Sequence, residues 1–259
     1  MEQTIQAVYA SDEATLRLQI ESALQSAPRD IPSVPPIGLV VPDSNDLAGR
    51  FIAATAFATL EGNEYSTVIV VSGTHQDPFG KITICKSDDV SSPLGSVPVN
   101  TAMREELCDE DDDIFIDDEG HFSDSGTPVQ LPFLQCTLKD FDVVPIVMGD
   151  ESLPFCKELG SAIGEVIFNR RVLVVATINV KHATVGAMDA LKTAVENLDI
   201  DAAVALLERK DEITISGIGP FLVMLLAAKH RRAHEAFVVQ PPDPGTDSLR
   251  RIAAVVLYP

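Results

Sequence analysis

Apolar residues gather in three short and almost uninterrupted runs along this chain, and polar residues follow each run. The runs cover residues 37–41, 67–71 and 172–177 and consist mainly of Val, Ile, Leu and Ala. Runs without polar alternation are typical of strands that are buried on both faces, as in a parallel sheet covered by helices. The pattern therefore predicts the centre of an α/β fold.

Segments with helical spacing alternate with further apolar segments along the rest of the chain. Helices are predicted at 12–27, 47–60, 129–138, 154–167, 187–198, 202–209 and from 220 onward, strands at 142–148, 236–239 and 253–258, an edge strand at 81–85, and a loop with a turn at 92–98. This alternation predicts a three-layer α/β/α arrangement around a mostly parallel sheet. No repeat or long linker divides the sequence, so we expect residues 1–259 to form one domain.

Four polar residues follow the three buried runs: Asp43, His75, Asn179 and His182. Open α/β sheets bind ligands beyond the carboxyl ends of their strands, so we expect these four residues to share one rim. Two imidazoles and one carboxylate also form the ligand set of a non-haem iron site. Asp43, His75 and His182 are therefore candidate metal ligands, and Asn179 is a candidate pocket residue.

The chain carries a strong excess of acidic residues, with a formal net charge of −20 from 39 acidic and 19 basic side chains. Such a charge opposes binding to nucleic acid and to anionic membranes, because their phosphates require a basic surface. Part of the excess lies in residues 105–113. We interpret this run as a solvated acidic loop, because it lacks the repeated Asp-x-Asp pattern of a calcium-binding loop. His121, beside it, is expected to lie on the surface.

Two further features indicate the compartment. No apolar run is long enough to cross a bilayer, and residues 1–4 lack the basic and apolar regions of a signal peptide. The four cysteines show no Cys-x-x-Cys spacing, which favours reduced thiols over a metal or redox motif. The sequence therefore predicts a cytoplasmic protein.

Several short motifs follow the order in which they occur in the Memo family, whose fold is similar to that of class III extradiol ring-cleavage dioxygenases. The matching segments are residues 7–12, 72–75, 92–99, 129–135, 145–150 and 215–220. Residues 129–135 resemble the family pattern almost letter for letter. The resemblance extends over most of the chain and implies the α/β fold of that family.

The departures from the family pattern fall on its metal site. Asp43 and Ser125 stand in place of histidines, Asn179 in place of an aspartate, and Ser216 in place of a cysteine. Only His75 and His182 are retained. The resemblance therefore implies a degenerate site, with Asn179, Ser216 and Ser125 lining a polar pocket.

Two functions remain open. The first is a Memo-like protein that binds a small ligand or a partner protein in this pocket without catalysis. The alternative is a metal-dependent oxidoreductase or dioxygenase in which Asp43, His75 and His182 hold Fe(II), Mn or Zn, the ions that imidazole and carboxylate ligands suit. No catalytic residue is assigned in either case.

Overall fold

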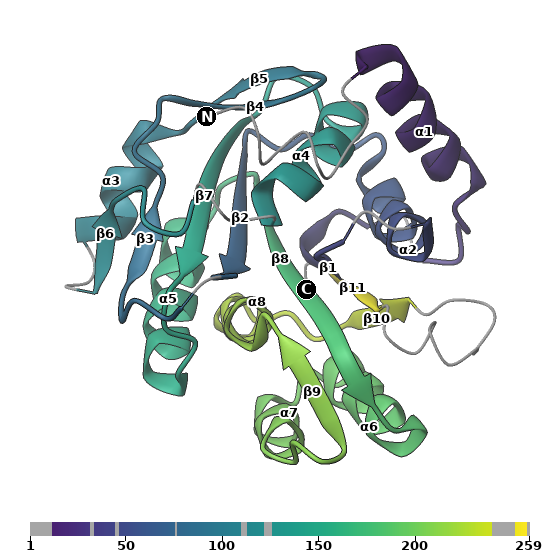
Figure 1. Ribbon diagram of the computed structural model, residues 1–259, viewed down its shortest axis with the longest axis vertical. Coiled ribbons are helices and arrows are strands. Elements are labelled where there is room, and N and C mark those ends of the chain that lie inside the picture. Colours follow the sequence, from purple (N-terminus) through teal and green to yellow (C-terminus); the bar gives the residue numbers. More distant parts are fainter. Residues whose placement is uncertain are drawn as a thin grey trace.

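The computed structural model describes residues 12–31, 34–44, 47–75, 77–109, 113–121, 126–239 and 252–257. Helices cover both faces of one large central sheet, which is parallel at its centre (Figure 1). This arrangement confirms the predicted α/β fold class. Within the described ranges, no helix is both long and apolar enough to cross a membrane.

The strands of the sheet follow one another in space in an order different from their order in sequence. That order is β10 (Ala236–Val239), β11 (Ala253–Leu257), β1 (Pro36–Pro42), β8 (Val172–Ala183), β2 (Thr67–Gly73), β7 (Asp142–Met148), β3 (Ile82–Ile84) and β6 (Ile114–Ile116), with β9 (Ile213–Ser216) paired to β8. The four central strands, β1, β8, β2 and β7, are parallel. Their carboxyl ends therefore meet at one edge of the sheet, as the sequence predicts.

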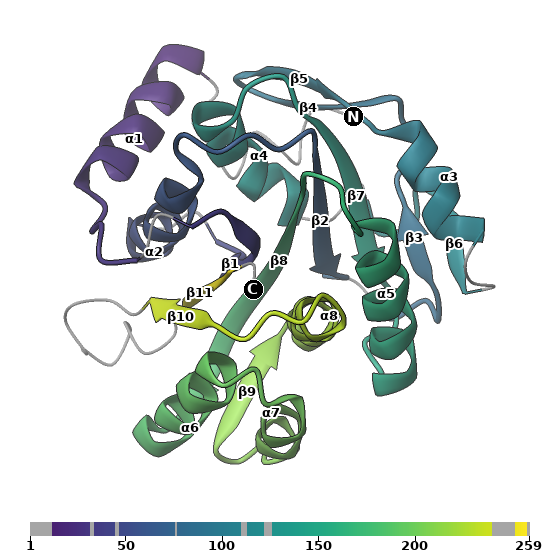
Figure 2. The same ribbon diagram turned by 180° about the vertical axis from the view of Figure 1, so that it is seen from behind.

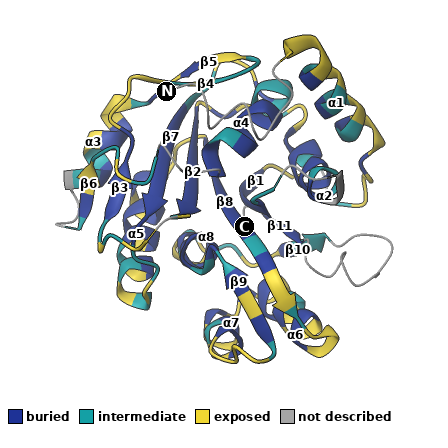
Figure 3. Cartoon of the chain, in the orientation of Figure 1, coloured by how far each residue is buried: buried dark blue, intermediate teal, exposed yellow. Residues whose placement is uncertain are grey.

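The central strands are buried because helices pack on both of their faces. One face carries α1 (Glu13–Ser26), α2 (Leu47–Phe57), the short η2 (Ala58–Leu60) and α4 (Gly126–Thr137), and the other carries α3 (Thr101–Asp109), α5 (Leu153–Val166), α6 (Val185–Glu196), α7 (Ile200–Leu207) and α8 (Ile218–His230). In β2, Val68 and Val70 belong to one apolar core and Ile69 and Val71 to the other. Because alternate side chains of a strand point to opposite faces, the apolar run must be unbroken (Figure 3).

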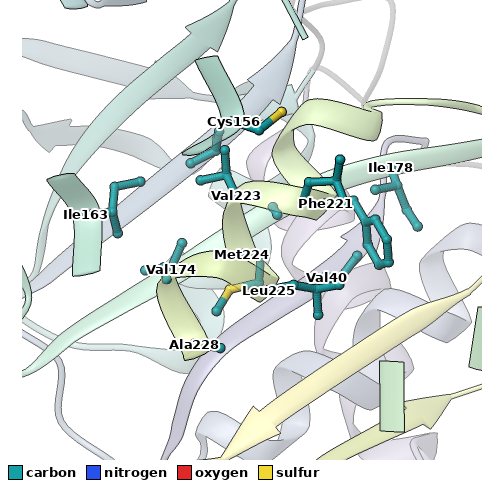
Figure 4. Packing of buried hydrophobic residues seen from close by; sticks show 14 of the residues in the cluster. Val40, Cys156, Ile163, Val174, Ile178, Phe221, Val223, Met224, Leu225 and Ala228 are labelled. Carbon is teal, nitrogen blue, oxygen red and sulfur yellow. The ribbon is translucent and has the colours of Figure 1, made fainter. Parts of the chain in front are cut away.

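Helix α8 packs closely on the sheet and lies beside α5 (Figure 2). Met224 of α8 lies in the buried cluster with Val40 and Val174 of the strands beneath it (Figure 4). A Cβ atom on Gly38 of β1 would lie 2.2 Å from Met224 Sδ and 2.8 Å from the Val174 carbonyl oxygen. The missing side chain of Gly38 therefore permits this close approach of helix to sheet.

Strand β3 corrects the prediction of an edge strand at residues 81–85. It pairs with β7 on one side and β6 on the other, and all three of its residues are buried. Thr83 produced the polar alternation that suggested an exposed face, but its hydroxyl donates a hydrogen bond of 2.8 Å to the Glu119 carbonyl oxygen. Burial of this threonine is possible because its polar atom has a partner.

Residues 92–98 and His121 also differ from their predictions. The expected loop and turn at 92–98 forms most of a hairpin between β4 (Asp89–Ser92) and β5 (Gly95–Pro98), whose largely exposed faces leave no apolar pattern in the sequence. His121 is only partly exposed. Its Nε2 lies 3.3 Å from the Thr83 carbonyl oxygen, so the backbone of β3 draws the ring inward.

Strand β8 is twice as long as the run that predicted it. Residues 172–178 pair with β1 and β2, whereas residues 179–183 pair antiparallel with β9 and contain an irregularity between Val180 and His182. The far end of β8 is exposed (Figure 3). This extension decides where the polar residues after residue 177 lie.

Candidate functional site

The carboxyl ends of β1 and β2 bring Asp43 and His75 into direct contact. Asp43 follows β1, and its backbone N–H donates a hydrogen bond of 2.8 Å to the carbonyl oxygen of Ile178 in β8. His75 follows β2, and its Nε2 lies 2.6 Å from Asp43 Oδ2. The Asp43 side chain is only 5% exposed, while that of His75 is 35% exposed. The pair therefore offers an accessible imidazole held by a buried carboxylate.

Asn179 and Ser216 lie opposite each other where β8 pairs with β9. The Ser216 hydroxyl donates to the Asn179 carbonyl oxygen at 3.5 Å, at the limit of a hydrogen bond. Gly217 follows with a φ of 80°, and a Cβ there would lie 2.4 Å from the Thr177 carbonyl oxygen. A left-handed glycine is thus required for the chain to turn from β9 into α8 beside these two polar residues.

His182 lies farther along β8 and is exposed. It pairs with Thr214 of β9, four residues beyond Ile178, which is the partner of Pro42. At about 3.3 Å per strand residue, this places the His182 backbone roughly 13 Å beyond that of Ile178. Within the described chain, no hydrogen bond or ion pair joins His182 to Asp43 or His75.

Ser125 and the three-residue metal site are the remaining predicted features. Ser125 lies outside the residues that the structure describes. Among the residues that are described, no group of three or more His, Cys, Asp or Glu side chains is arranged to hold a metal ion. The structure thus brings Asp43 to His75 and Asn179 to Ser216, whereas the joint role of Asp43, His75 and His182 as metal ligands remains a prediction.

Glu151 is a site residue that the sequence reasoning missed. It follows β7, the fourth parallel strand, and its Oε2 accepts a hydrogen bond of 2.8 Å from the backbone N–H of Gly219 in the first turn of α8. A Cβ on Gly73 would lie 2.0 Å from Glu151 Oε1, so the carboxylate lies directly against the end of β2. Its position three residues after a buried strand was the available signal, but it stands in an Asp-Glu pair that resembles ordinary surface charge.

The environment of Glu151 is electrostatically mixed. Burial raises the pKa of the Glu151 carboxyl, while the N–H groups of Gly219 and Ile218 and the charges of His75 and Lys181 act to lower that pKa. The helix N-terminus and the imidazole therefore both stabilise a carboxylate that is otherwise costly to bury. We call Asp43, His75 and Glu151 the rim cluster, because each follows a central strand at the same edge of the sheet.

The family comparison covers almost the whole chain. A family model described as Memo-like protein matches residues 5–246. A MEMO1 family protein of Saccharolobus islandicus (strain L.S.2.15) is 27% identical over 259 residues, which cover 93% of this chain and 90% of the relative. A MEMO1 family protein of Thermoplasma acidophilum is 26% identical over 207 residues, which cover 78% of this chain and 76% of the relative.

A solved structure agrees with the fold. The crystal structure of the uncharacterized protein JW3007 from Escherichia coli K12 superposes with a TM-score of 0.51 and 14% sequence identity. The superposition covers 85% of this chain and 98% of the JW3007 chain. At that identity the likeness concerns the fold and not the chemistry of the site.

Proposed function

This chain belongs to the Memo-like protein family, and from that premise we propose that its rim cluster binds a small polar ligand without catalysis. The observation that carries the proposal is the 2.6 Å contact between His75 Nε2 and Asp43 Oδ2 at the carboxyl ends of neighbouring parallel strands. This edge is where open α/β sheets place their ligands. The ligand is expected to contact the exposed part of the His75 ring.

The charges of the rim favour a neutral or cationic ligand over an anionic one. Asp43 brings a buried carboxyl group and Glu151 a half-buried one to the same edge, and each has a partner in the protein. An anion placed there would meet these carboxylates across a poorly screened distance. Asn179 and Ser216 add amide and hydroxyl groups that donate and accept hydrogen bonds. These groups suit a small molecule with its own donors, such as an amide or an amine.

The alternative is a metal-dependent oxidoreductase. Asp43 and His75 supply oxygen and nitrogen donors of the kind that Fe(II), Mn and Zn accept, and such an ion would act as a Lewis acid. The third residue does not fit as it stands, since His182 is exposed on the β8 extension and is not bonded to the pair. A partner protein is a further possible occupant of the rim.

A cytoplasmic location forms part of the proposal. All four cysteines are free. The thiol of Cys156 donates a hydrogen bond of 3.5 Å to the Glu151 carbonyl oxygen. Burial and the nearby carboxylates raise the pKa of this thiol to about 12, which disfavours the reactive thiolate. Free thiols that are held protonated are compatible with the reducing conditions of a cytoplasm.

Metal analysis distinguishes the two functions. Protein purified without chelator, and protein loaded anaerobically with Fe(II), Mn or Zn, is measured for metal content alongside His75→Ala and His182→Ala. The exposed His234 gives a matched control in His234→Ala. We expect no stoichiometric metal in any sample. One equivalent of metal that both site variants lose, and the control keeps, would establish the metal-dependent alternative and exclude our proposal.

Ligand binding is tested directly by NMR with a set of small amides and amines. A binding molecule should shift the ring signals of His75, and Asp43→Asn should weaken that binding because the imidazole loses its anchoring carboxylate. If every molecule that binds leaves the His75 signals unchanged, the rim is not the binding site.

A further inference from the structure

A cavity lies at the edge of the sheet opposite the rim cluster, where the parallel strands begin. It has a volume of about 700 Å³, within the range of roughly 300–1,000 Å³ that is common for small-molecule sites. Its wall includes Tyr65 before β2, residues 169–171 before β8, and Arg231 after α8. The rim cluster contributes nothing to this wall, so the cavity is separate from the site described above.

Three arginines line this one cavity, although the chain has only 19 basic residues against 39 acidic ones. They are Arg170, Arg171 and Arg231, and the lining contains a single acidic residue, Glu64. Glu64 pairs with Arg171, and Glu106, outside the lining, pairs with Arg170, so the three arginines leave one positive charge in excess at the cavity of a molecule whose net charge is −20. A random distribution of charges on this chain would place acidic groups around a cavity more often than basic ones.

Arg231 is the most informative of the three. Its guanidinium carbon lies 4.4 Å from the centre of the Phe168 ring, a cation–π distance that fixes the side chain. Its Nε is buried without a hydrogen-bond partner, and no carboxylate of the described chain forms an ion pair with it. Buried arginine donors normally have partners. The Phe168 ring thus holds the guanidinium in position, and no carboxylate of the described chain neutralises its charge. Because Nε is buried, a ligand in the cavity would have to be bound by the outer nitrogens of the guanidinium.

The other two arginines are held differently. Arg170 forms a two-bond pair with Glu106, at 2.6 and 2.9 Å, which orients the guanidinium plane. Arg171 contacts Glu64 at 2.7 Å, but both side chains are largely exposed, at 72% and 84%. Exposed pairs contribute little to stability, so a ligand could replace Glu64 at Arg171 at small cost.

Helix ends offer a simpler explanation that does not account for all of these facts. Arg231 follows α8 and Arg170 follows α5, and cations near helix carboxyl ends offset the helix dipole. That role requires only charge. It does not require that two helix ends and the start of β8 bring their arginines around one cavity, nor that Arg231 remain without a carboxylate.

We propose that this cavity binds a small organic anion through a phosphate or carboxylate group. The forked guanidinium matches both groups, because each presents two or more oxygens in one plane. Asn63 and Asn169 in the wall offer amides beside the arginines. Nucleic acid and anionic membranes are disfavoured as ligands, since the net charge of −20 repels an extended polyanion.

Calorimetry on the full chain at low ionic strength tests the proposal with three probes: inorganic phosphate, glycerol phosphate and succinate. We expect saturable binding of one equivalent. Arg231→Gln should weaken it about tenfold or more, because a charge-assisted hydrogen bond is lost. Arg231→Lys keeps the positive charge but lacks the forked guanidinium, so its affinity should lie between those of the wild type and Arg231→Gln. Arg209→Gln is the matched control, since Arg209 is exposed beside Glu212 and does not line the cavity.

The outcomes separate the ligand classes. Binding of both phosphates but not succinate assigns a phosphate ligand, and the reverse assigns a carboxylate. If no probe saturates, or if Arg209→Gln weakens binding as much as Arg231→Gln, the effect is one of general charge and the proposal is wrong. Thermal unfolding checks that each variant is folded. Should Arg231→Gln not fold, Arg171→Gln takes its place, because that exposed side chain can be changed with little structural cost.

Discussion

Gly38 shows how one missing side chain sets the distance between a helix and the sheet. A side chain there would meet both the flexible Met224 and the fixed carbonyl oxygen of Val174. Met224 could move aside, but the carbonyl belongs to the central strand β8 and could not. The contact with the Val174 carbonyl oxygen should therefore make any substitution at Gly38 destabilising.

Gly38→Ala is expected to lower the free energy of unfolding by about 1–3 kcal/mol, the usual cost of overpacking a core. Urea unfolding measures the change. Gly186→Ala in α6 is the matched control, because nothing lies within 4 Å of its added Cβ, and it should cause no loss. Equal stability of the two variants would mean that the sheet and α8 can separate without cost.

His121 is a second residue whose environment predicts a measurable effect. Burial lowers the pKa of its imidazole from 6.5 to about 4, although the nearby Thr83 carbonyl and two aspartates oppose this. The folded state therefore binds the proton more weakly than the unfolded chain does. The neutral imidazole therefore contributes to the free energy of unfolding. This contribution is fully present above pH 6.5 and is lost as the pH falls toward about 4.

Replacement of His121 should remove this pH dependence. Between pH 6.5 and about 4, the free energy of unfolding of the wild type should fall more steeply than that of His121→Gln. The difference in slope cannot exceed about 1.4 kcal/mol per pH unit, the value for one proton. Urea unfolding at several pH values measures both slopes. The exposed His234 provides a control, since His234→Gln should keep the wild-type slope.

The site residues show what a sequence can and cannot place. Asp43 and His75 could be predicted to converge because each directly follows a buried parallel strand, and strand order alone brings such residues to one edge. Glu151 also follows a buried strand, but its contact with the backbone of Gly219, 68 residues later, has no sequence signal that separates it from ordinary surface charge. His182 was displaced from the expected position because β8 continues as a strand beyond Ile178.

At the scale of elements, the sequence predicts structure where the residues of a segment determine it alone. The long buried strands β1, β2 and β7 and the helices α5 and α6 begin and end close to the expected residues. The short β6 and β9 were not predicted. Helix α3 was not predicted either, and it corrects the interpretation of residues 105–113 as a solvated loop, because residues 105–109 belong to this helix and Leu107 is fully buried. Strands β6 and β9 have only three and four residues, and they exist here because a partner strand supplies their hydrogen bonds.

Helix α7 begins after an aspartate cap whose contribution to stability can be measured. Asp199 precedes it, and its carboxylate accepts a hydrogen bond of 3.0 Å from the Ala202 N–H. Asp199→Ala removes this cap and should lower the free energy of unfolding by about 1 kcal/mol, whereas Asp199→Asn keeps an acceptor and should cost little. Chemical denaturation compares the three proteins. If the two variants lose the same stability, the charge of Asp199 matters and the cap does not.

The two sites lie at opposite edges of the sheet on the scale of the whole molecule. The rim cluster is at the carboxyl ends of the parallel strands, and the arginine-lined cavity is at their amino ends. The sequence indicated the first edge, because polar residues follow the apolar runs. It gave no sign of the second, because Arg170, Arg171 and Arg231 come together only when α5, β8 and α8 pack. Cavities built from distant helix ends have no local pattern.

The net charge of −20 leads to the last prediction. Salt weakens exposed ion pairs, which lowers stability, and it also screens repulsion among like charges, which raises stability. The pair of Arg171 with Glu64 is typical of the exposed ion pairs, and such pairs contribute only about 0–1 kcal/mol each. An excess of 20 negative charges repels throughout the molecule, so we expect screening of this repulsion to prevail.

The midpoint of thermal unfolding should therefore rise as NaCl increases to about 0.15 M, where the Debye length is about 8 Å. A falling midpoint in NaCl would show that the ion pairs outweigh the repulsion, and that the acidic residues are spaced widely enough to be nearly independent.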